Sequence, residues 1–222
     1  FALSIVVESQ DGISVAMITV AVVNMSEEIM DSIRSGVNKG TGIPFKNVLV
    51  SATHTHSGPV MGNISGDYAK FFIKRSVESA VKAWEGRVVG RIGVGTTNVF
   101  GLAMNDRRME YGGVPPDPEA AIIKIEDDKG KLLGVFFNYG CHPSALDLHN
   151  LKFTEDWPHF SIKGIKEKVG QNVVVGYFQS AQGDAKVGYN AELSAVGAYM
   201  QGIRSFEFAE HKGLIMTDAV LK

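Results

Sequence analysis

The sequence predicts an α/β fold with mixed, partly parallel sheets and flanking helices in a single compact domain. Short apolar, β-branched runs alternate along the chain with longer segments whose apolar residues recur at helical spacing. The chain has 222 residues, of which 45% are hydrophobic and 21% charged, enough to bury a sizeable core. We therefore expect residues 1–222 to form one α/β domain.

Composition excludes several classes of partner. A formal net charge of -2 gives no general attraction to polyanions, so we expect no nucleic-acid partner. No apolar run reaches the roughly 18 residues of a membrane-spanning helix, so we expect no transmembrane segment. Because the first residues, FALSIVVESQDG, look like a strand, we expect a longer native chain, periplasmic or secreted if a signal peptide precedes it. The lone Cys141 excludes an intramolecular disulfide.

The first part of the chain predicts two strands, a helix and a further strand. Apolar runs at 2–7 and 15–22, separated by turn-forming residues at 10–12, predict a hairpin. Asn24 is the expected N-cap of the helix, and an apolar strand returns at 47–53. The apolar stripe of this helix has a spacing of four: Ile29, Ile33 and Val37. Strand, helix and strand in this order indicate a partly parallel sheet.

The rest of the chain repeats this alternation. We expect further helices at about 68–84, 158–168 and 192–210, and strands at 87–99, 121–126, 132–139 and 172–178. The stretch GLAMNDRRMEYGGVPPDPE, rich in glycine and proline, predicts a loop.

The stretch NVLVSATHTHSGP places His54 and His56 at the end of the strand predicted at 47–53. On an extended segment, residues two apart point to the same side, so both imidazoles can converge on one ion or substrate group. Open α/β sheets also bind ligands at the carboxyl ends of their strands. The alternative is a hydrogen-bonded core histidine beside a solvated one.

Three further features add to this pair. FFNYGCHPSAL brings His142 to the end of another strand, and a catalytic zinc needs three protein ligands and an open position. Asp184, in QGDA, is a candidate to bind a metal, orient a histidine or cap the next turn. Arg107 and Arg108 are candidates to clamp a carboxylate, phosphate or oxyanion. The alternatives are a structural histidine, a capping aspartate and solvated arginines.

These stretches, followed by FTEDWPHFSIKGIKEKVG and FQSAQGDA in this order, resemble the N-terminal catalytic domain of the neutral/alkaline non-lysosomal ceramidase family. The resemblance spans nearly the whole chain. It implies a zinc amidase, acting on a lipid or small-molecule amide, with zinc ligated by His54 and His142. It also implies supporting roles for His56 and Arg107. Asp156 matches an acidic position that the relatives often keep.

Two departures from the family bear on function. The family has a serine in a GDxSPN element, where this chain has GDAKVGYN with Lys186 in the serine's place. The family's other two zinc ligands, a glutamate and a tyrosine, lie downstream of this region. Either a longer native chain supplies them, or the ion has a different third ligand, for which Asp184 and His56 are the nearest candidates. We expect a zinc-dependent hydrolase with water as nucleophile, acting on an amide or related ester. The alternative is a non-catalytic scaffold or binding module with a partial metal site.

Overall fold

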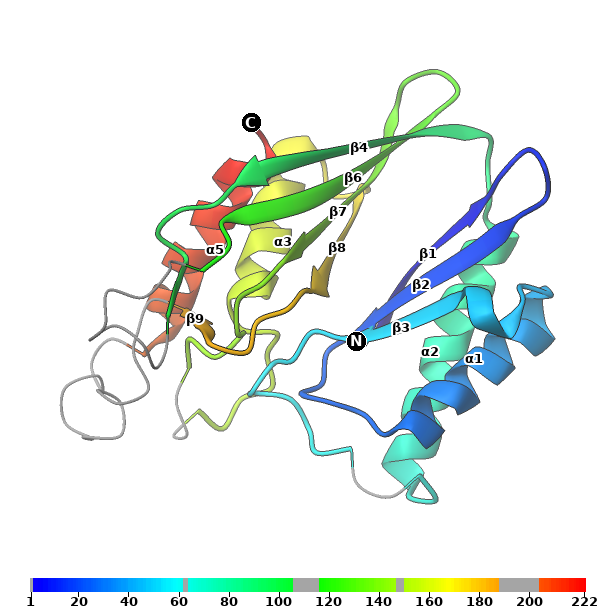
Figure 1. The fold of residues 1–222 in the computed structure, drawn as a ribbon, viewed down its shortest axis with the longest axis horizontal. Coiled ribbons are helices and arrows are strands. Elements are labelled where there is room, and N and C mark those ends of the chain that lie inside the picture. Colours follow the sequence, from blue (N-terminus) through cyan, green and yellow to red (C-terminus); the bar gives the residue numbers. More distant parts are fainter. Residues whose placement is uncertain (1, 62–63, 106–115, 147–149, 188–203) are drawn as a thin grey trace. The chain divides into compact units, whose positions relative to one another are not determined.

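In the computed structural model of this chain, each of two units contains a larger sheet, and a pair of helices covers one face of that sheet (Figure 1). The structure describes residues 2–61, 64–105, 116–146, 150–187 and 204–222. One unit comprises residues 1–53 and 59–89, and the other residues 54–58 and 90–222. Each has its own buried hydrophobic cluster. In the described residues, no helix is long and apolar enough to cross a membrane.

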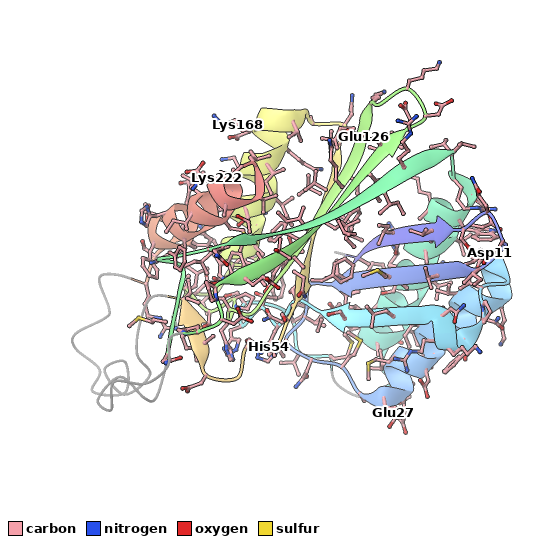
Figure 2. All side chains as sticks on the ribbon, turned by 45° about the horizontal axis from the view of Figure 1, so that its top comes forward. Asp11, Glu27, His54, Glu126, Lys168 and Lys222 are labelled. Atoms are coloured by element: carbon pink, nitrogen blue, oxygen red, sulfur yellow. The ribbon has the colours of Figure 1, made fainter. Side chains whose placement is uncertain are left out.

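The first unit follows the predicted order of strands and helices. Its elements are β1 (Ala2–Glu8), β2 (Ser14–Val20), α1 (Glu27–Thr41), a 3-10 turn η1 (Phe45–Asn47), β3 (Val48–Ala52) and α2 (Asp67–Glu85). The sheet order is β1-β2-β3, with β1 antiparallel and β3 parallel to β2. Asp11, labelled in Figure 2, lies in the turn of the β1–β2 hairpin.

Helix α1 buries its predicted apolar stripe but begins later than expected. Ile29, Ile33 and Val37 are buried, as predicted. The N-cap is Ser26, not Asn24, because Ser26 is extended and its hydroxyl accepts a hydrogen bond from the amide of Ile29. The helix ends at Gly42, whose φ of 79° lies in the left-handed region that glycine adopts without strain.

The second unit holds a four-stranded sheet, a two-stranded sheet and two helices in its described part. Its elements are β4 (Gly90–Asn98), β5 (Ala103–Asn105), β6 (Glu119–Asp127), β7 (Leu132–Tyr139), α3 (Trp157–Val169), β8 (Val174–Gln179), β9 (Ala185–Val187) and α5 (Phe206–Val220). The larger sheet has the order β4-β6-β7-β8, in which only the β7–β8 pair is parallel and is connected through α3. Helices α3 and α5 pack against each other, and the core lies between them and this sheet.

These sheets confirm the predicted α/β class with partly parallel pairing, and they correct two details. Strand β5 lies within the stretch predicted to be a loop, because it pairs with β9 over three residues. The helix expected at 192–210 falls partly on residues 188–203, outside the described residues. The described helix α5 begins at Phe206, where Ser205 caps it, and continues ten residues past the predicted end, because no proline or exposed glycine interrupts it before Val220. The expectation of one domain over residues 1–222 stays a prediction; the contacts within the chain group its residues into the two compact units described above.

Candidate metal site

Two chain segments bring three histidines together within the second unit. His54 and His56 lie on the segment 54–58, which follows β3, and His142 lies on the segment that follows β7. Figure 2 labels His54 where the chain leaves β3. The three side chains each place a ring nitrogen within 4.8 Å of the other two. The ring centroids are 4.9 Å apart for His54 and His142, 5.2 Å for His54 and His56, and 5.5 Å for His56 and His142.

The backbone of His54 takes a conformation that the sequence does not indicate. Its φ is 67°, in the left-handed region that costs a non-glycine residue about 1–2 kcal/mol. Residues 53–55 are therefore not a continuation of the strand, and the two imidazoles converge through a turn rather than by alternation along an extended segment. Strain of this kind persists only where surrounding contacts hold the residue in place.

His142 is oriented by the backbone of β9. Its main-chain amide donates to the carbonyl oxygen of Ala185 over 2.9 Å, and its Nδ1 lies 3.2 Å from the same oxygen. The tautomer that donates from Nδ1 leaves the Nε2 lone pair for a ligand. Gly140 permits this geometry, because a side chain there would collide with the carbonyl of Ala181.

Both His56 and His142 are neutral at pH 7. Although the His56 residue remains partly exposed, the atoms around its ring desolvate it, and this desolvation, assisted by the charges of His54, Lys186 and Arg204, lowers the pKa of His56 to about 4. Burial and then the charge of Lys186 lower the pKa of His142 to about 4, although its hydrogen bond to Ala185 acts in the opposite direction. Neutral imidazole is the form that ligates metals, so these rings need no deprotonation before binding.

Hydrogen bonds fasten the two histidine segments to each other and to the loop before α3. The amide of His56 donates to the carbonyl of Pro143 over 3.1 Å. The buried hydroxyl of Thr55 donates to the carbonyl of Thr154 over 2.7 Å, and the amide of Thr154 donates to the carbonyl of Ser57 over 3.1 Å. The site is thus held by backbone contacts as well as by side chains.

The other residues considered in the sequence lie either outside the histidine cluster or outside the described part of the chain. Asp184 lies in the turn before β9, and its carboxylate does not belong to the cluster of histidine nitrogens. Lys186 is on β9, and its ammonium charge acts on His56 and His142. Arg107 and Arg108 lie outside the described residues.

Sequence reasoning missed two residues beside the histidines. Arg204 donates from Nη2 to the carbonyls of Ser144 and Leu146, over 3.2 and 2.9 Å. Ala185 contributes only its backbone oxygen. No local pattern marks either residue, because their partners lie far away in the sequence and a backbone carbonyl has no signature in the amino-acid type.

The donor set fits a divalent transition metal. Three imidazoles match the protein ligands of a three-histidine catalytic zinc site, which keeps a fourth position open. The cluster is partly accessible, since His142 is buried, His54 is half-buried and His56 is exposed. The three histidines can therefore form a metal site that is partly open to solvent.

Comparisons with known structures support the fold. No protein-family model and no curated protein matches this sequence. The structure is similar to that of neutral ceramidase from Pseudomonas aeruginosa, with a TM-score of 0.81 and 18% sequence identity over 99% of this chain. A ceramidase complexed with C2 is similar with a TM-score of 0.79, also at 18% identity over 99% of the chain. This chain spans 38% and 37% of the length of those two ceramidase chains.

Proposed function

We propose that this ceramidase-like chain is the metal-binding part of a zinc-dependent hydrolase that cleaves an amide or a related acyl bond. The observation that carries the proposal is the convergence of His54, His56 and His142 within 4.8 Å. The fold shared with two ceramidases supports an N-acyl lipid as the class of substrate to test first. Zinc is the proposed ion because it accepts an all-imidazole set with an open position.

In this proposal, His54 and His142 hold the ion and His56 completes the set. The geometry favours His56 over Asp184 as the third ligand, because the ring of His56 belongs to the cluster and the Asp184 carboxylate does not. A bound zinc ion would supply Lewis acidity, which polarises a carbonyl and acidifies water. The resemblance of the NDRR stretch implies a supporting role for Arg107, and we assign this residue to the developing oxyanion.

Two groups of the chain prepare the ligands. In this proposal the Ala185 carbonyl, 3.2 Å from Nδ1 of His142, holds the ring proton on Nδ1 and so leaves Nε2 as the ligand atom. Asp184 immediately precedes Ala185 in the turn, and we assign it the placing of that carbonyl. Water exclusion around His142 keeps its ring neutral at pH 7.

Metal content of the purified protein tests the site. We expect near-stoichiometric zinc by elemental analysis in wild type, and loss of zinc in His54→Ala and in His142→Ala. His211→Ala is the matched control, because His211 is an exposed histidine on α5 outside the cluster. This control should retain the zinc of wild type. Zinc absent from wild type after supplementation would overturn the proposal.

Turnover tests the reaction separately from the metal. Zinc-loaded protein is offered N-acyl lipids, small N-acyl amides and the corresponding esters, and release of the free acid is measured. His54→Ala should abolish release, and His211→Ala should leave it unchanged. Bound zinc without release from any of these acyl compounds would contradict hydrolysis while leaving the metal site intact.

The second candidate is a non-catalytic module that binds metal weakly, and Lys186 favours it. This residue replaces the serine of the ceramidase family with a cation whose charge acts on two of the three histidines. A positive charge beside the site lowers affinity for a second cation. Lys186→Ser distinguishes the two candidates: hydrolysis by wild type supports the enzyme, whereas hydrolysis that appears only in Lys186→Ser supports the inactive module.

A further inference from the structure

Asp156 is a buried carboxylate for which the proposed chemistry has no use. Its side chain has no exposed surface, and burial raises its pKa. Its backbone φ of 64° is again in the left-handed region, so Asp156 and His54 are the two non-glycine residues with positive φ among the residues that the structure describes. Ionisable groups are seldom buried without dedicated partners, and left-handed backbone is retained only when neighbouring contacts fix it.

The partners of Asp156 are backbone amides of two segments. Its Oδ1 accepts from the amides of Ala145 and Trp157, each over 2.8 Å. Its Oδ2 accepts from the amide of Leu146 over 3.0 Å. The carboxylate therefore caps the first turn of α3 and at the same time holds the loop that begins at His142.

The residues around Asp156 connect it to all three histidines. Trp157, buried and next in the chain, donates from its ring nitrogen to the carbonyl of His142 over 3.2 Å. On the other side, Thr154 accepts from Thr55 and donates to Ser57, the neighbours of His54 and His56. The hydroxyl of Thr154 also accepts from the amide of Asp156 over 3.0 Å. The short stretch 154–157 thus contacts both histidine segments.

We propose that Asp156 is a positioning residue, which fixes the His142 loop against the segment 54–58 so that the three imidazoles converge on one ion. The inference rests on the proposed metal site and deepens it. A carboxylate suits this position for two reasons. Its two oxygens can accept from three amides at once, and aspartate tolerates the left-handed backbone better than most residues.

The structure also explains why other residues are poor substitutes. Asparagine keeps the size and the backbone preference but presents an NH2 group to at least one amide that must donate. Alanine removes every acceptor and adds backbone strain, because its φ would have to remain positive. Asp156→Asn is therefore the sharper variant, and Asp156→Ala is the more disruptive one.

The test compares Asp156→Asn with a core variant that loosens the same unit elsewhere. Val175→Ala is suitable, because Val175 is fully buried on β8 in the hydrophobic cluster that also contains Trp157. Its side chain makes none of the hydrogen bonds described above. Zinc affinity is measured by competition with a chromogenic chelator. The absorption spectrum of cobalt-loaded protein reports the ligand geometry. We expect Asp156→Asn to lower zinc affinity by about 10- to 100-fold and to shift the cobalt spectrum.

A metal-free measurement keeps the inference testable even if the protein binds no zinc. The ring resonances of His54 and His142 are followed by long-range 1H–15N NMR of the apo protein. Asp156→Asn should shift both, and Val175→Ala should leave both in place. Zinc binding absent from wild type would overturn the proposed function alone. Wild-type ring resonances and metal affinity in Asp156→Asn, with a melting temperature lowered as in Val175→Ala, would overturn the positioning role.

Discussion

At the scale of single residues, the site depends on short polar contacts that hold the backbone beside each histidine. Thr55, between His54 and His56, has no exposed surface and both donates and accepts a hydrogen bond. It donates to the carbonyl of Thr154, and it accepts from the amide of Ser57. The side chain between the two candidate ligands is therefore structural.

Replacing Thr55 by valine should destabilise the protein. Valine has nearly the same shape, so the change removes the hydroxyl and leaves the half-buried carbonyl of Thr154 and the half-buried amide of Ser57 without this partner. We expect a loss of about 1–3 kcal/mol in the free energy of unfolding, measured by urea denaturation. Thr55→Ser retains the hydroxyl and should lose less. Equal losses in both variants would show that the hydroxyl contributes nothing.

The lowered pKa values of His56 and His142 predict how stability changes with pH in the metal-free protein. Both pKa values are about 4 in the folded state, against an ordinary value near 6.5. Between these values the unfolded chain binds protons that the folded protein does not. The contribution of these rings to stability is therefore fully present above pH 6.5 and is lost as pH falls towards 4.

Burial raises the pKa of Glu155 to about 7, and this shift changes stability with pH in the opposite direction. Comparing wild type with a histidine variant separates the effect of the histidines from that of Glu155. Thermal unfolding of wild type and His142→Gln is followed from pH 7.5 to pH 4. The melting temperature of wild type should fall more steeply on acidification than that of His142→Gln. This corresponds to a difference in the free energy of unfolding on the order of 1–3 kcal/mol across this range. Parallel profiles would contradict a neutral His142 in the folded state.

At the scale of elements, the contact between α3 and α5 holds the start of α3, where Asp156 is the N-cap and Trp157 the first residue. Gly213 on α5 packs directly on the first turns of α3. A side-chain carbon at Gly213 would lie 2.5 Å from Cβ of Phe160 and 2.8 Å from the carbonyl oxygen of Trp157. Glycine is thus required here for close approach of the helices.

Gly213→Ala should destabilise the protein even though alanine is the better helix former by about 1 kcal/mol. The added methyl group meets backbone atoms that cannot rotate away, so we expect a net loss of about 1–3 kcal/mol in chemical denaturation. Leu214→Ala, at an exposed position of the same helix, should change stability far less. A Gly213→Ala variant as stable as wild type would mean that α3 and α5 separate without cost.

Long periodic elements were predictable from the sequence, and short ones were not. The stripe Ile29, Ile33 and Val37 identified α1, since three buried positions at one spacing outweigh local noise. Strands β5 and β9 escaped prediction because three residues are too few to show alternation. The cap of α1 was misplaced because Asn24 and Ser26 are both good caps, and only the backbone decides between them.

The candidate site, like the fold, was predictable from the sequence only in part. His54, His56 and His142 were identifiable because each follows an apolar strand, and the structure brings all three together. The groups that orient them were not identifiable, because the Ala185 carbonyl and the Asp156 carboxylate act through contacts with backbone distant in the sequence. The left-handed turn at His54 likewise depends on its surroundings, since histidine adopts it only where other contacts hold it.

At the scale of the whole molecule, zinc should stabilise the folded chain. Only the folded protein holds the three imidazoles together, so binding shifts the unfolding equilibrium. We expect about 2.7 kcal/mol of added stability at a free zinc concentration 100 times the dissociation constant, seen as a higher melting temperature. A chelator should reverse the increase, and His54→Ala should not show it. A melting temperature that is independent of zinc would contradict the site.

The separation of His54 and His142 along the chain gives such an ion a second effect. Ligation of both would tie together two points about 90 residues apart, and an unfolded chain would have to meet the entropy cost of closing a loop of that length before it could bind the ion in the same way. The single cysteine rules out a covalent bridge within this chain. The metal would therefore act as a reversible cross-link, removable by acid or by a chelator, in a chain that cannot form a disulfide of its own.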